Sequence, residues 1–331
     1  MLLLLRGARL LSRRSMAPTA IPTCALSASS PASVLSIISA AASPSTISSS
    51  STMSSLSSSS SIRAFSSHRH HVDALSKLSE LLITGEVEVV DCTAVLGPGT
   101  PLLKLPPDFA KDTPPIKIHR ISEYDKNGPF WAWNWLELGE HSGTHFDAPH
   151  HWITGRDYAD GYTDTLPVQR LVAPVNVLDF AKECNENSDF LLTLDHIKAW
   201  EDIHGTIKAG EWVVMRSDWD KRSHDQDLFI NANETGPHSP GPTAETIEYL
   251  LTKDIVGWGS QCIGTDAGQA GGMIPPYPAH NLLHKHNRFG LASLANLDKL
   301  PPKGAILIAA PLKIKGGTGS PIRALALVPK G

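Results

Sequence analysis

Hydrophobic and polar positions along this chain alternate mostly at the spacing of β-strands. Runs rich in apolar and β-branched residues predict strands over residues 86–90, 116–121, 131–138, 211–216, 305–314 and 322–328. Three segments show helical spacing beside a start or stop signal: Leu75, Leu78 and Leu82 before Gly85; Leu194, Ile197 and Trp200 after Thr193; and Ile247, Leu250 and Leu251 after Thr243. With no internal repeat and no second linker, these elements predict one α+β domain over residues 73–331.

Residues 1–72 differ in kind from the rest of the chain. They include the serine-rich run SSSSTMSSLSSSSSIR and six arginines but no acidic residue, so they have little to bury and are expected to be disordered. An Arg-rich, Ser-rich, acid-free segment is typical of an organellar transit peptide. The stretch RAFSS at 63–67 resembles a mitochondrial processing site, which predicts a mitochondrial protein. A chloroplast address stays open, as does a cytoplasmic protein translated from Met16 or Met53.

The remaining body of the chain is acidic. Of the 29 Lys and Arg residues six lie in residues 1–72, so the body has 23 of them against 33 Asp and Glu. Nucleic acids and anionic membranes reward positive charge, so neither is expected as a partner and small-molecule chemistry is favoured. The cysteines of the body, Cys92, Cys184 and Cys262, lack CxxC spacing and are expected to be buried reduced thiols.

The segment GEHSGTHFDAPHHW, residues 139–152, concentrates metal-binding side chains. Its donors are His141, His145, Asp147, His150 and His151. Four residues of extended chain span roughly 13 Å, whereas two nitrogens on one zinc-like ion must lie within roughly 4 Å. A bend at Gly143 would let two of the imidazoles share an ion, and strand period two would then point His145 and Asp147 the same way. Two imidazoles and a carboxylate describe a catalytic metal site that keeps an open position for water.

The eleven residues HSGTHFDAPHH have the form H-x-G-T-H-x-D-x-P-x-H. In this the chain resembles the metal-dependent cyclase-like hydrolases, a family that includes bacterial-type kynurenine formamidase and isatin hydrolase. Further blocks that resemble the family follow in the expected order: VVDCTAVLGPGTP precedes the motif, and NETGPHSPG, GTDAGQAGG, PAHNLL and LANLDKLPPKGAILIAAPLKIKGGTGSP come after it. The resemblance covers nearly all of residues 86–330. It implies a swivelling β/β/α fold in a single domain, usually a homodimer, that hydrolyses a small amide, lactam or lactone.

Carried over position by position, the resemblance implies a role for each donor of the motif. His141, His145 and Asp147 match the ligands of one divalent ion, Zn or Mn, and His151 matches the histidine that transfers protons. Such an ion lowers the pKa of its bound water, which can then attack a carbonyl that the same ion polarises. An imidazole of near-neutral pKa can take the proton of that water and deliver it to the leaving nitrogen.

One position departs from the two-metal kynurenine formamidases. In those enzymes a later histidine, matched here by His280, works with a glutamate twelve positions on, where this chain has Ala292. Loss of that carboxylate favours one metal ion, as on the isatin-hydrolase side of the family. His280 then stays open as a second-metal ligand, a partner of the ligands or a substrate contact. His284 and His286 are interpreted as part of a solvated helix face.

Other clusters have more than one interpretation. Trp131, Trp133 and Trp135 share one face of a predicted strand just before the metal loop, so they could stack on an aromatic substrate. Core packing or a dimer seam explains two of the three about as well. The run DWDKRSHD (218–225) is interpreted as a solvated loop rather than a metal site, and KGGTGSP as a tight turn between the last two strands.

Two function classes follow. The first is a metal-dependent hydrolase of C–N bonds other than peptide bonds, acting on a small aryl amide. The preferred substrate for this class is N-formylkynurenine, which would place the enzyme in tryptophan catabolism to kynurenine. Isatin-type lactams and small lactones are the alternative substrates. The second is a non-catalytic descendant that keeps the fold for binding. The intact motif, from His141 to His151, favours the enzyme.

Overall fold

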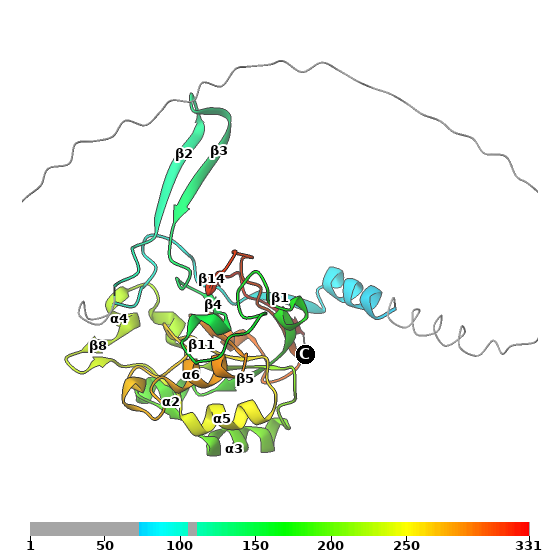
Figure 1. The fold of residues 1–331 in the computed structure, drawn as a ribbon. Helices are drawn as coiled ribbons and strands as arrows, with labels where there is room; N and C mark the ends of the chain where they lie inside the picture. The colour runs from blue at the N-terminus through cyan, green and yellow to red at the C-terminus, as the bar shows by residue number, and fades with distance from the viewer. Residues whose placement is uncertain (1–72, 105–110, 331) are drawn as a thin grey trace, which may run out of the picture. The chain divides into compact units, whose positions relative to one another are not determined.

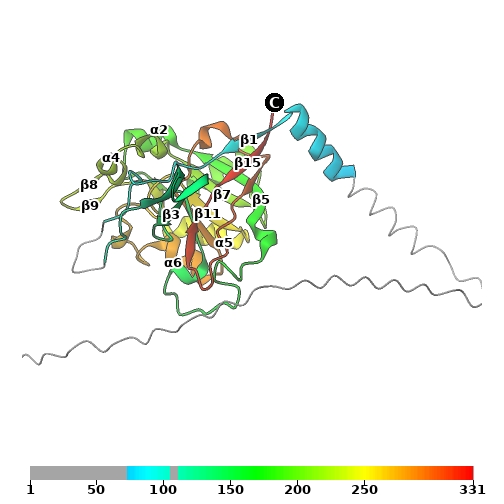
Figure 2. The same ribbon diagram turned by 90° about the horizontal axis from the view of Figure 1, so that it is seen from above.

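One mixed sheet of nine strands forms the centre of the described part of the chain, residues 73–104 and 111–330 of this computed structural model. Its strands are β1 (Val87–Asp91), β4 (His145–Asp147), β5 (Val172–Asp179), β7 (Trp212–Arg216), β11 (Gly257–Ser260), β12 (Phe289–Ala292), β13 (Ala305–Ile308), β14 (Gly319–Pro321) and β15 (Leu325–Pro329). They lie in the order β1-β15-β13-β5-β7-β11-β12-β4-β14. Figure 2 shows β1 beside its antiparallel partner β15. The predicted segment 1–72 lies outside the described residues.

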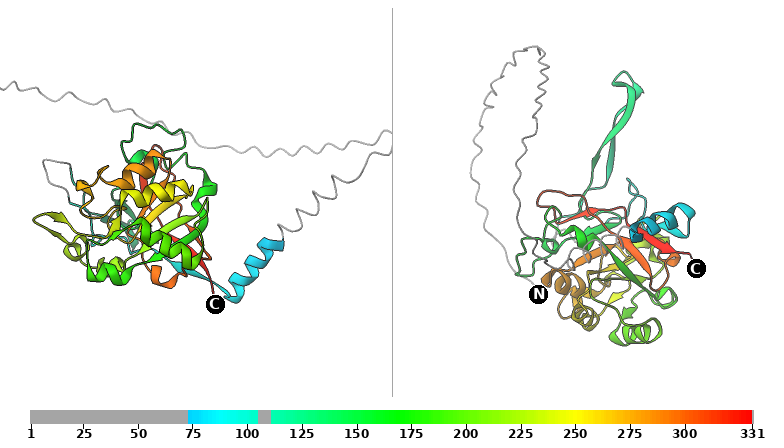
Figure 3. Two further views of the ribbon diagram at one scale, coloured as in Figure 1. Left: turned by 90° about the horizontal axis from the view of Figure 1, so that it is seen from below. Right: turned by 90° about the vertical axis from the view of Figure 1, so that its right-hand side faces the viewer.

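The four strands β5, β7, β11 and β12 run parallel, and the strands on both sides of them pair antiparallel. Helices connect the parallel strands, as such crossovers require. The labelled helices are α2 (Ala181–Glu186), α3 (Leu194–His204), α4 (Gln226–Ile230), α5 (Ala244–Thr252) and α6 (Pro278–Lys285). Figures 1 and 3 show α3 and α5 side by side on one face of the sheet. Within the described ranges no helix is both long enough and apolar enough to cross a membrane.

The sheet separates two apolar cores. Alternate residues of β7 enter different cores: Trp212 and Val214 pack with β5, β12 and β13, whereas Val213 and Met215 pack under the helices. Both sets are fully buried. The sequence of β7 is therefore a continuous apolar run, which is typical of parallel strands covered on both faces. One mixed sheet with helices packed on it is the single α+β domain that the sequence predicts.

The predicted helices form where their capping residues indicate. Residues 73–84 are helical, and the N-cap Thr243 of α5 accepts a hydrogen bond from the backbone N–H of Thr246 (3.2 Å). The single strand predicted over 305–314 is wrong, because β13 ends at Ile308. Pro311 follows, and a proline has no N–H to continue the ladder.

A hairpin of β2 (Lys117–Asp125) and β3 (Gly128–Glu137) pairs only with itself among the described strands. Figures 1 and 3 show it standing away from the main sheet. Two smaller pairings join β6 (Leu191–Leu192) to β10 (Gly241–Pro242) and β8 (Ala232–Asn233) to β9 (Gly236–Pro237). Short 3-10 helices are η1 (Pro149–His151), η2 (Val168–Leu171), η3 (Trp219–Arg222), η4 (Ala270–Gly272) and η5 (Leu297–Lys299).

Candidate metal centre

Strand β4 carries two of the predicted donors into the site. It lies between β12 and β14, and Phe146 packs into the core against Phe289. Because side chains alternate along a strand, His145 and Asp147 point to the opposite face. Before the strand, Gly143 adopts a φ of 61°, and an added Cβ there would lie 2.9 Å from Cδ1 of Leu96. The bend that the sequence requires therefore exists, and glycine suits both its angle and its space.

The bend brings the predicted donors together. Nδ1 of His141 lies 2.7 Å from Oδ1 of Asp147, and Nε2 of His145 lies 3.3 Å from the same oxygen. Ligand atoms of all three residues lie within 4.8 Å of one another. Oδ2 of Asp147 is buried and has no hydrogen-bond partner among the described residues. A buried carboxylate oxygen without a partner beside two imidazoles fits a divalent ion.

Hydrogen bonds outside the donor set orient both imidazoles. Nδ1 of His145 donates to the carbonyl of Gly143 (2.7 Å), which leaves Nε2 free to bind a cation. Nε2 of His141 lies 3.1 Å from Oγ1 of Thr318, which itself donates to Glu140 (2.7 Å), so His141 faces the site with Nδ1. Metal-binding histidines usually donate their other N–H in this way. Thr318 and Glu140 were missed by the sequence analysis, which placed no function on KGGTGSP.

Two glycines make room for Asp147. In the sheet register Asp147 is paired with Gly290 of β12 on one side and Gly319 of β14 on the other. An added Cβ at Gly290 would lie 2.8 Å from Oδ2 of Asp147, and one at Gly319 would lie 2.3 Å from Cε1 of His141. Larger residues at these positions would occupy the space of the donor set. KGGTGSP is thus more than a turn, because its end forms β14.

Charge in the cluster is distributed unevenly. Burial alone would raise the pKa of Asp147, but the surrounding imidazoles hold it well below its usual range. Burial alone would lower the pKa of His145, and the nearby Asp147 carboxylate holds it above its ordinary value instead. Burial lowers the pKa of His151 to about 2, and Asp147 offsets this only in part. The site thus keeps an anionic carboxylate next to a neutral imidazole.

His151 and His280 complete the cluster from other elements. His151 ends η1, and its ring stacks on His141 with centroids 3.7 Å apart. With Asp147 and His280 it forms a second set of ligand atoms within 4.8 Å. Asp266, which the sequence analysis missed, holds His280 in place: its Oδ2 lies 2.5 Å from Nδ1, and its Oδ1 accepts the N–H of Ala279 at the start of α6.

Other histidines of interest lie elsewhere or play structural parts. His150 turns away from the cluster, stacks on Tyr162 and contacts the carbonyl of Tyr158 (3.0 Å). The solvated position expected for His284 is wrong, because this side chain is fully buried, with its ring edge-on to that of His151 in η1 (centroids 6.0 Å apart). His286 is exposed, as expected. Ala292 pairs with His145 in the sheet and supplies no donor.

The run 218–225 forms no metal group with its neighbours. Asp218 pairs with Arg216 (2.9 Å) and Lys221. Oδ2 of Asp220 accepts the backbone N–H of Asn296 (3.0 Å). Among the described residues only the two sets around Asp147 have metal-binding geometry. The solvated loop expected here is wrong, because Trp219–Arg222 form the 3-10 helix η3 and Trp219 is buried. The three cysteines of the body are buried and reduced, as expected.

The hairpin tryptophans are not brought to the cluster within the described chain. Trp131, Trp133 and Trp135 are each about half exposed, and the ring contact of Trp135 is with His119 of the neighbouring strand (3.8 Å). Core packing therefore does not explain them. A dimer seam or a substrate contact stays a prediction.

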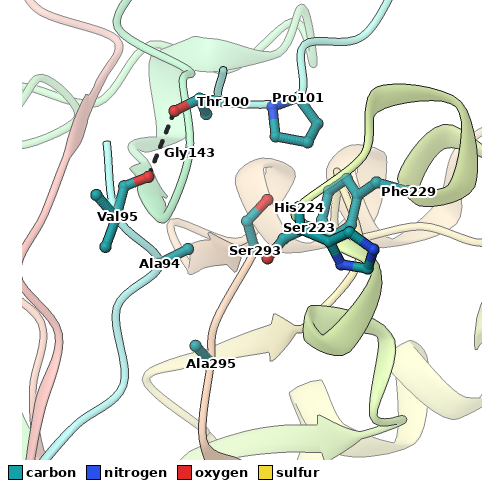
Figure 4. A pocket seen from close by; sticks show the side chains of 10 residues that line it. All are labelled: Ala94, Val95, Thr100, Pro101, Gly143, Ser223, His224, Phe229, Ser293 and Ala295. Carbon is teal, nitrogen blue, oxygen red and sulfur yellow. Dashed lines mark hydrogen bonds between the residues drawn. The ribbon is translucent and has the colours of Figure 1, made fainter. Parts of the chain in front are cut away.

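A pocket of about 260 Å³ lies beside the bend of the metal loop (Figure 4). Its lining includes the apolar side chains of Val95, Pro101 and Phe229, together with Gly143 and Ser293. The carbonyl of Ser293 accepts the hydroxyl of Thr144, so this wall is tied to the loop (2.5 Å). None of the donors in the cluster lines the pocket.

The curled sheet and the His/Asp donor set define the class of metal-dependent hydrolases with the cyclase fold. A family model described as "Putative cyclase" matches residues 90–267, and the chain belongs to this family. It is 77% identical over 257 residues to an isatin hydrolase of Roseibium aggregatum, a match that covers 78% of this chain and 98% of that protein. A kynurenine formamidase of Salinibacter ruber is 30% identical over 57% of this chain and 77% of its own length.

A solved structure agrees with these relatives. It is an isatin hydrolase bound to the product analogue thioisatinate, with 76% identity and a TM-score of 0.77, and the match covers 78% of this chain and 98% of that one. The chain is therefore a hydrolase acting on C–N bonds other than peptide bonds. This sets aside the alternative of a non-catalytic descendant.

The mitochondrial location predicted from residues 1–72 is wrong, and so is its chloroplast alternative. The relative at 77% identity is a bacterial isatin hydrolase, which indicates a bacterial protein. An Arg-rich and Ser-rich composition marks a segment with little to bury, and by itself it carries no address.

Proposed function

We propose that this protein hydrolyses an isatin-type lactam, a cyclic aryl amide, within one catalytic domain over residues 73–331. The observation that carries the proposal is the 77% identity over 98% of an isatin hydrolase, against 30% identity to a kynurenine formamidase. Ala292, in place of the carboxylate expected in the two-metal enzymes, supports the same choice. The sequence-based preference for N-formylkynurenine therefore gives way to its alternative.

We assign one divalent ion, Zn or Mn, to His141, His145 and Asp147. The orphaned oxygen of Asp147 and the two oriented imidazoles support this assignment. A bound ion would supply a Lewis acid that lowers the pKa of water and polarises the amide carbonyl.

His151 is assigned the proton transfer. Burial lowers its pKa to about 2, well below the near-neutral value expected from the sequence, so the imidazole is neutral and a weak base. Its place in the cluster, stacked on His141, supports the role, because a neutral ring there can accept a proton from the attacking water. The same surroundings disfavour the imidazolium, so the proton passes on to the amide nitrogen as the C–N bond breaks. Water thus adds its hydroxyl to the carbonyl carbon and its proton to the nitrogen, and the lactam opens to an aryl amine and a carboxylic acid, which releases its own proton to solvent. His280, held by Asp266, is proposed to contact the substrate beside it.

A comparison of substrates tests this proposal. Metal-loaded protein should hydrolyse isatin with a far higher kcat/KM than N-formylkynurenine or a dienelactone. A much higher kcat/KM for N-formylkynurenine would restore the kynurenine-formamidase hypothesis. A much higher kcat/KM for the dienelactone would contradict the assignment of an amide substrate. Elemental analysis of the same preparation distinguishes Zn from Mn.

We propose that the hairpin forms the seam of a homodimer. Strand alternation places Trp131, Trp133 and Trp135 on one face of β3, where each is about half exposed, and exposed apolar side chains gathered in this way are typical of a protein interface. Trp133→Ser should shift the protein from dimer to monomer in analytical ultracentrifugation, with Glu123→Ser at the exposed end of the hairpin as control. A variant that stays dimeric but has a raised KM would instead support substrate contact by Trp133.

A further inference from the structure

A different tryptophan lies against the cluster. Trp152 directly follows His151 in the chain, and its ring centroid lies 4.8 Å from that of His280 at an interplanar angle of 34°. On its other side it meets Tyr277 edge-on, with centroids 5.6 Å apart. His280 itself belongs to the ligand set around Asp147. Trp152 and Tyr277 therefore extend the cluster by two aromatic rings.

The polar atoms of these two rings are unused. In the described part of the chain neither Nε1 of Trp152 nor the hydroxyl of Tyr277 has a hydrogen-bond partner, and both side chains are partly exposed. Of the four buried tryptophans in the described chain, three donate from Nε1 to carbonyls: Trp200 to Val177, Trp219 to Phe229 and Trp258 to Thr265. The fourth, Trp212, has no partner but is fully buried in the core. Trp152 differs from all four, because its ring is partly exposed beside the cluster and its Nε1 is unused.

The backbone of Tyr277 is also unusual. Its φ is 50° and its ψ is 62°, the left-handed region that a bulky residue rarely adopts. The conformation turns the ring over Gly271, where an added Cβ would lie 3.0 Å from the tyrosine hydroxyl. Such conformations cost free energy and cluster at ligand-binding sites. The surrounding structure thus holds the Tyr277 ring in place although its backbone conformation is unfavourable for a bulky residue.

We propose that Trp152 and Tyr277 form the surface on which the fused aromatic ring of the substrate stacks while its amide reaches the cluster. This inference rests on the proposed lactam hydrolysis. The rings of Trp152 and the proposed proton-transfer histidine His151 have centroids 6.2 Å apart, so a substrate ring packed on Trp152 would lie near the amide that His151 serves. The pair would therefore select lactams fused to an aromatic ring over lactams without one.

Two other apolar surfaces are less suited to bind the aromatic ring of the substrate. The pocket at Val95 and Phe229 (Figure 4) shares no lining residue with the cluster. The hairpin tryptophans make no contact with the cluster within the described chain. Only Trp152 joins an apolar ring directly to a member of the ligand set among the described residues.

Two substrates separate ring stacking from catalysis. Isatin carries the fused ring, and pyrrolidine-2,3-dione is the same lactam core without it. Trp152→Leu should lower kcat/KM for isatin about tenfold, near the upper end of what an aromatic pair contributes, and should leave pyrrolidine-2,3-dione nearly unchanged. Trp152→Phe keeps a ring and should retain most of the activity on isatin. Calorimetry should find about tenfold weaker binding of thioisatinate to Trp152→Leu, which is a readout independent of turnover.

Metal content and circular dichroism verify that the variants are intact. Should Trp152→Leu lose its metal or its fold, Tyr277→Asn is tested instead, because asparagine tolerates the left-handed backbone but removes the ring. Tyr277→Asn should lower kcat/KM for isatin several-fold and leave kcat/KM for pyrrolidine-2,3-dione nearly unchanged. Equal losses on both substrates, or no loss on either, would overturn the stacking role. If Phe229→Leu, rather than Trp152→Leu, lowers kcat/KM for isatin alone, the aromatic ring of the substrate binds in the pocket lined by Phe229. If the wild-type protein hydrolyses neither substrate, the lactam proposal itself fails, and thioisatinate binding then still tests the surface.

Discussion

Replacing Gly319 by alanine should remove the metal from this protein while leaving its fold in place. The added Cβ would lie 2.3 Å from Cε1 and 2.8 Å from Nδ1 of His141, and 2.6 Å from the carbonyl oxygen of Phe146. The carbonyl belongs to the paired strand β4 and cannot move far without breaking the sheet. The His141 ring is the more mobile of the two neighbours, so it should yield.

The size of the displacement follows from the same distances. Ordinary van der Waals contact for a Cβ begins at 3.4 Å, so the ring must withdraw by about 1 Å, whereas metal–ligand bonds tolerate only about 0.2 Å. We expect the affinity for a divalent ion to fall at least about 100-fold, the upper range for disturbing the partners of a ligand. Overpacking of the strand should also cost about 1–3 kcal/mol in the free energy of unfolding.

Titration of metal-free protein with Mn²⁺ in a calorimeter measures the first effect, and urea unfolding measures the second. Gly99→Ala is the matched control, because its Cβ meets no atom within 4 Å and its φ is not positive; it should match the wild type in both assays. A Gly319→Ala variant that binds Mn²⁺ as tightly as the wild type would refute the assignment of His141 as a ligand held at this distance.

Further tests concern the metal content, the proton-transfer residue His151, the ligand His145 and the buried His284. Elemental analysis should find close to one divalent ion per chain, because Ala292 offers no ligand for a second; two tightly held ions would contradict this. His151→Ala should lower turnover by about 10² to 10⁴ and keep the metal, whereas His145→Ala should lose it; equal metal loss would make His151 a ligand. Burial lowers the pKa of His284 to about 4, so the unfolded chain alone binds this proton as the pH falls below about 6.5. The unfolding free energy of metal-free protein should therefore fall by about 1.4 kcal/mol per pH unit from pH 6.5 to 4 on account of this group, and His284→Leu should flatten the slope measured by urea unfolding; an unchanged slope would contradict the burial.

The sequence by itself determined the parts of this protein that depend on near neighbours in the chain. Threonine caps and apolar spacing indicated α3 and α5, and alternating apolar runs indicated β1, β7 and β15. The donor set could be inferred in the same way, because His141, His145 and Asp147 lie within seven residues and a glycine bend with a strand of period two decides their geometry. Such local rules hold whatever the rest of the chain does.

Only the tertiary structure decided what surrounds these donors. Thr318 meets His141 from 177 positions away, and Asp266 holds His280 across 14 positions and a change of element. Gly290 and Gly319 show no signal in the sequence, because their role depends on which residue lies opposite them in the sheet. Register between distant strands is set by the packing of the whole sheet, which a local pattern does not contain.

Exposure was likewise decided by packing. His284 lies in the polar-looking segment HKHN, yet α6 turns it inward, while the aromatic strand WAWNW remains half exposed on a hairpin without a covering layer. The aromatic ring against the cluster proved to be Trp152, which no period in the sequence distinguishes from the other tryptophans. Periodicity shows that a segment has two faces, but the elements that pack around it decide which face is buried.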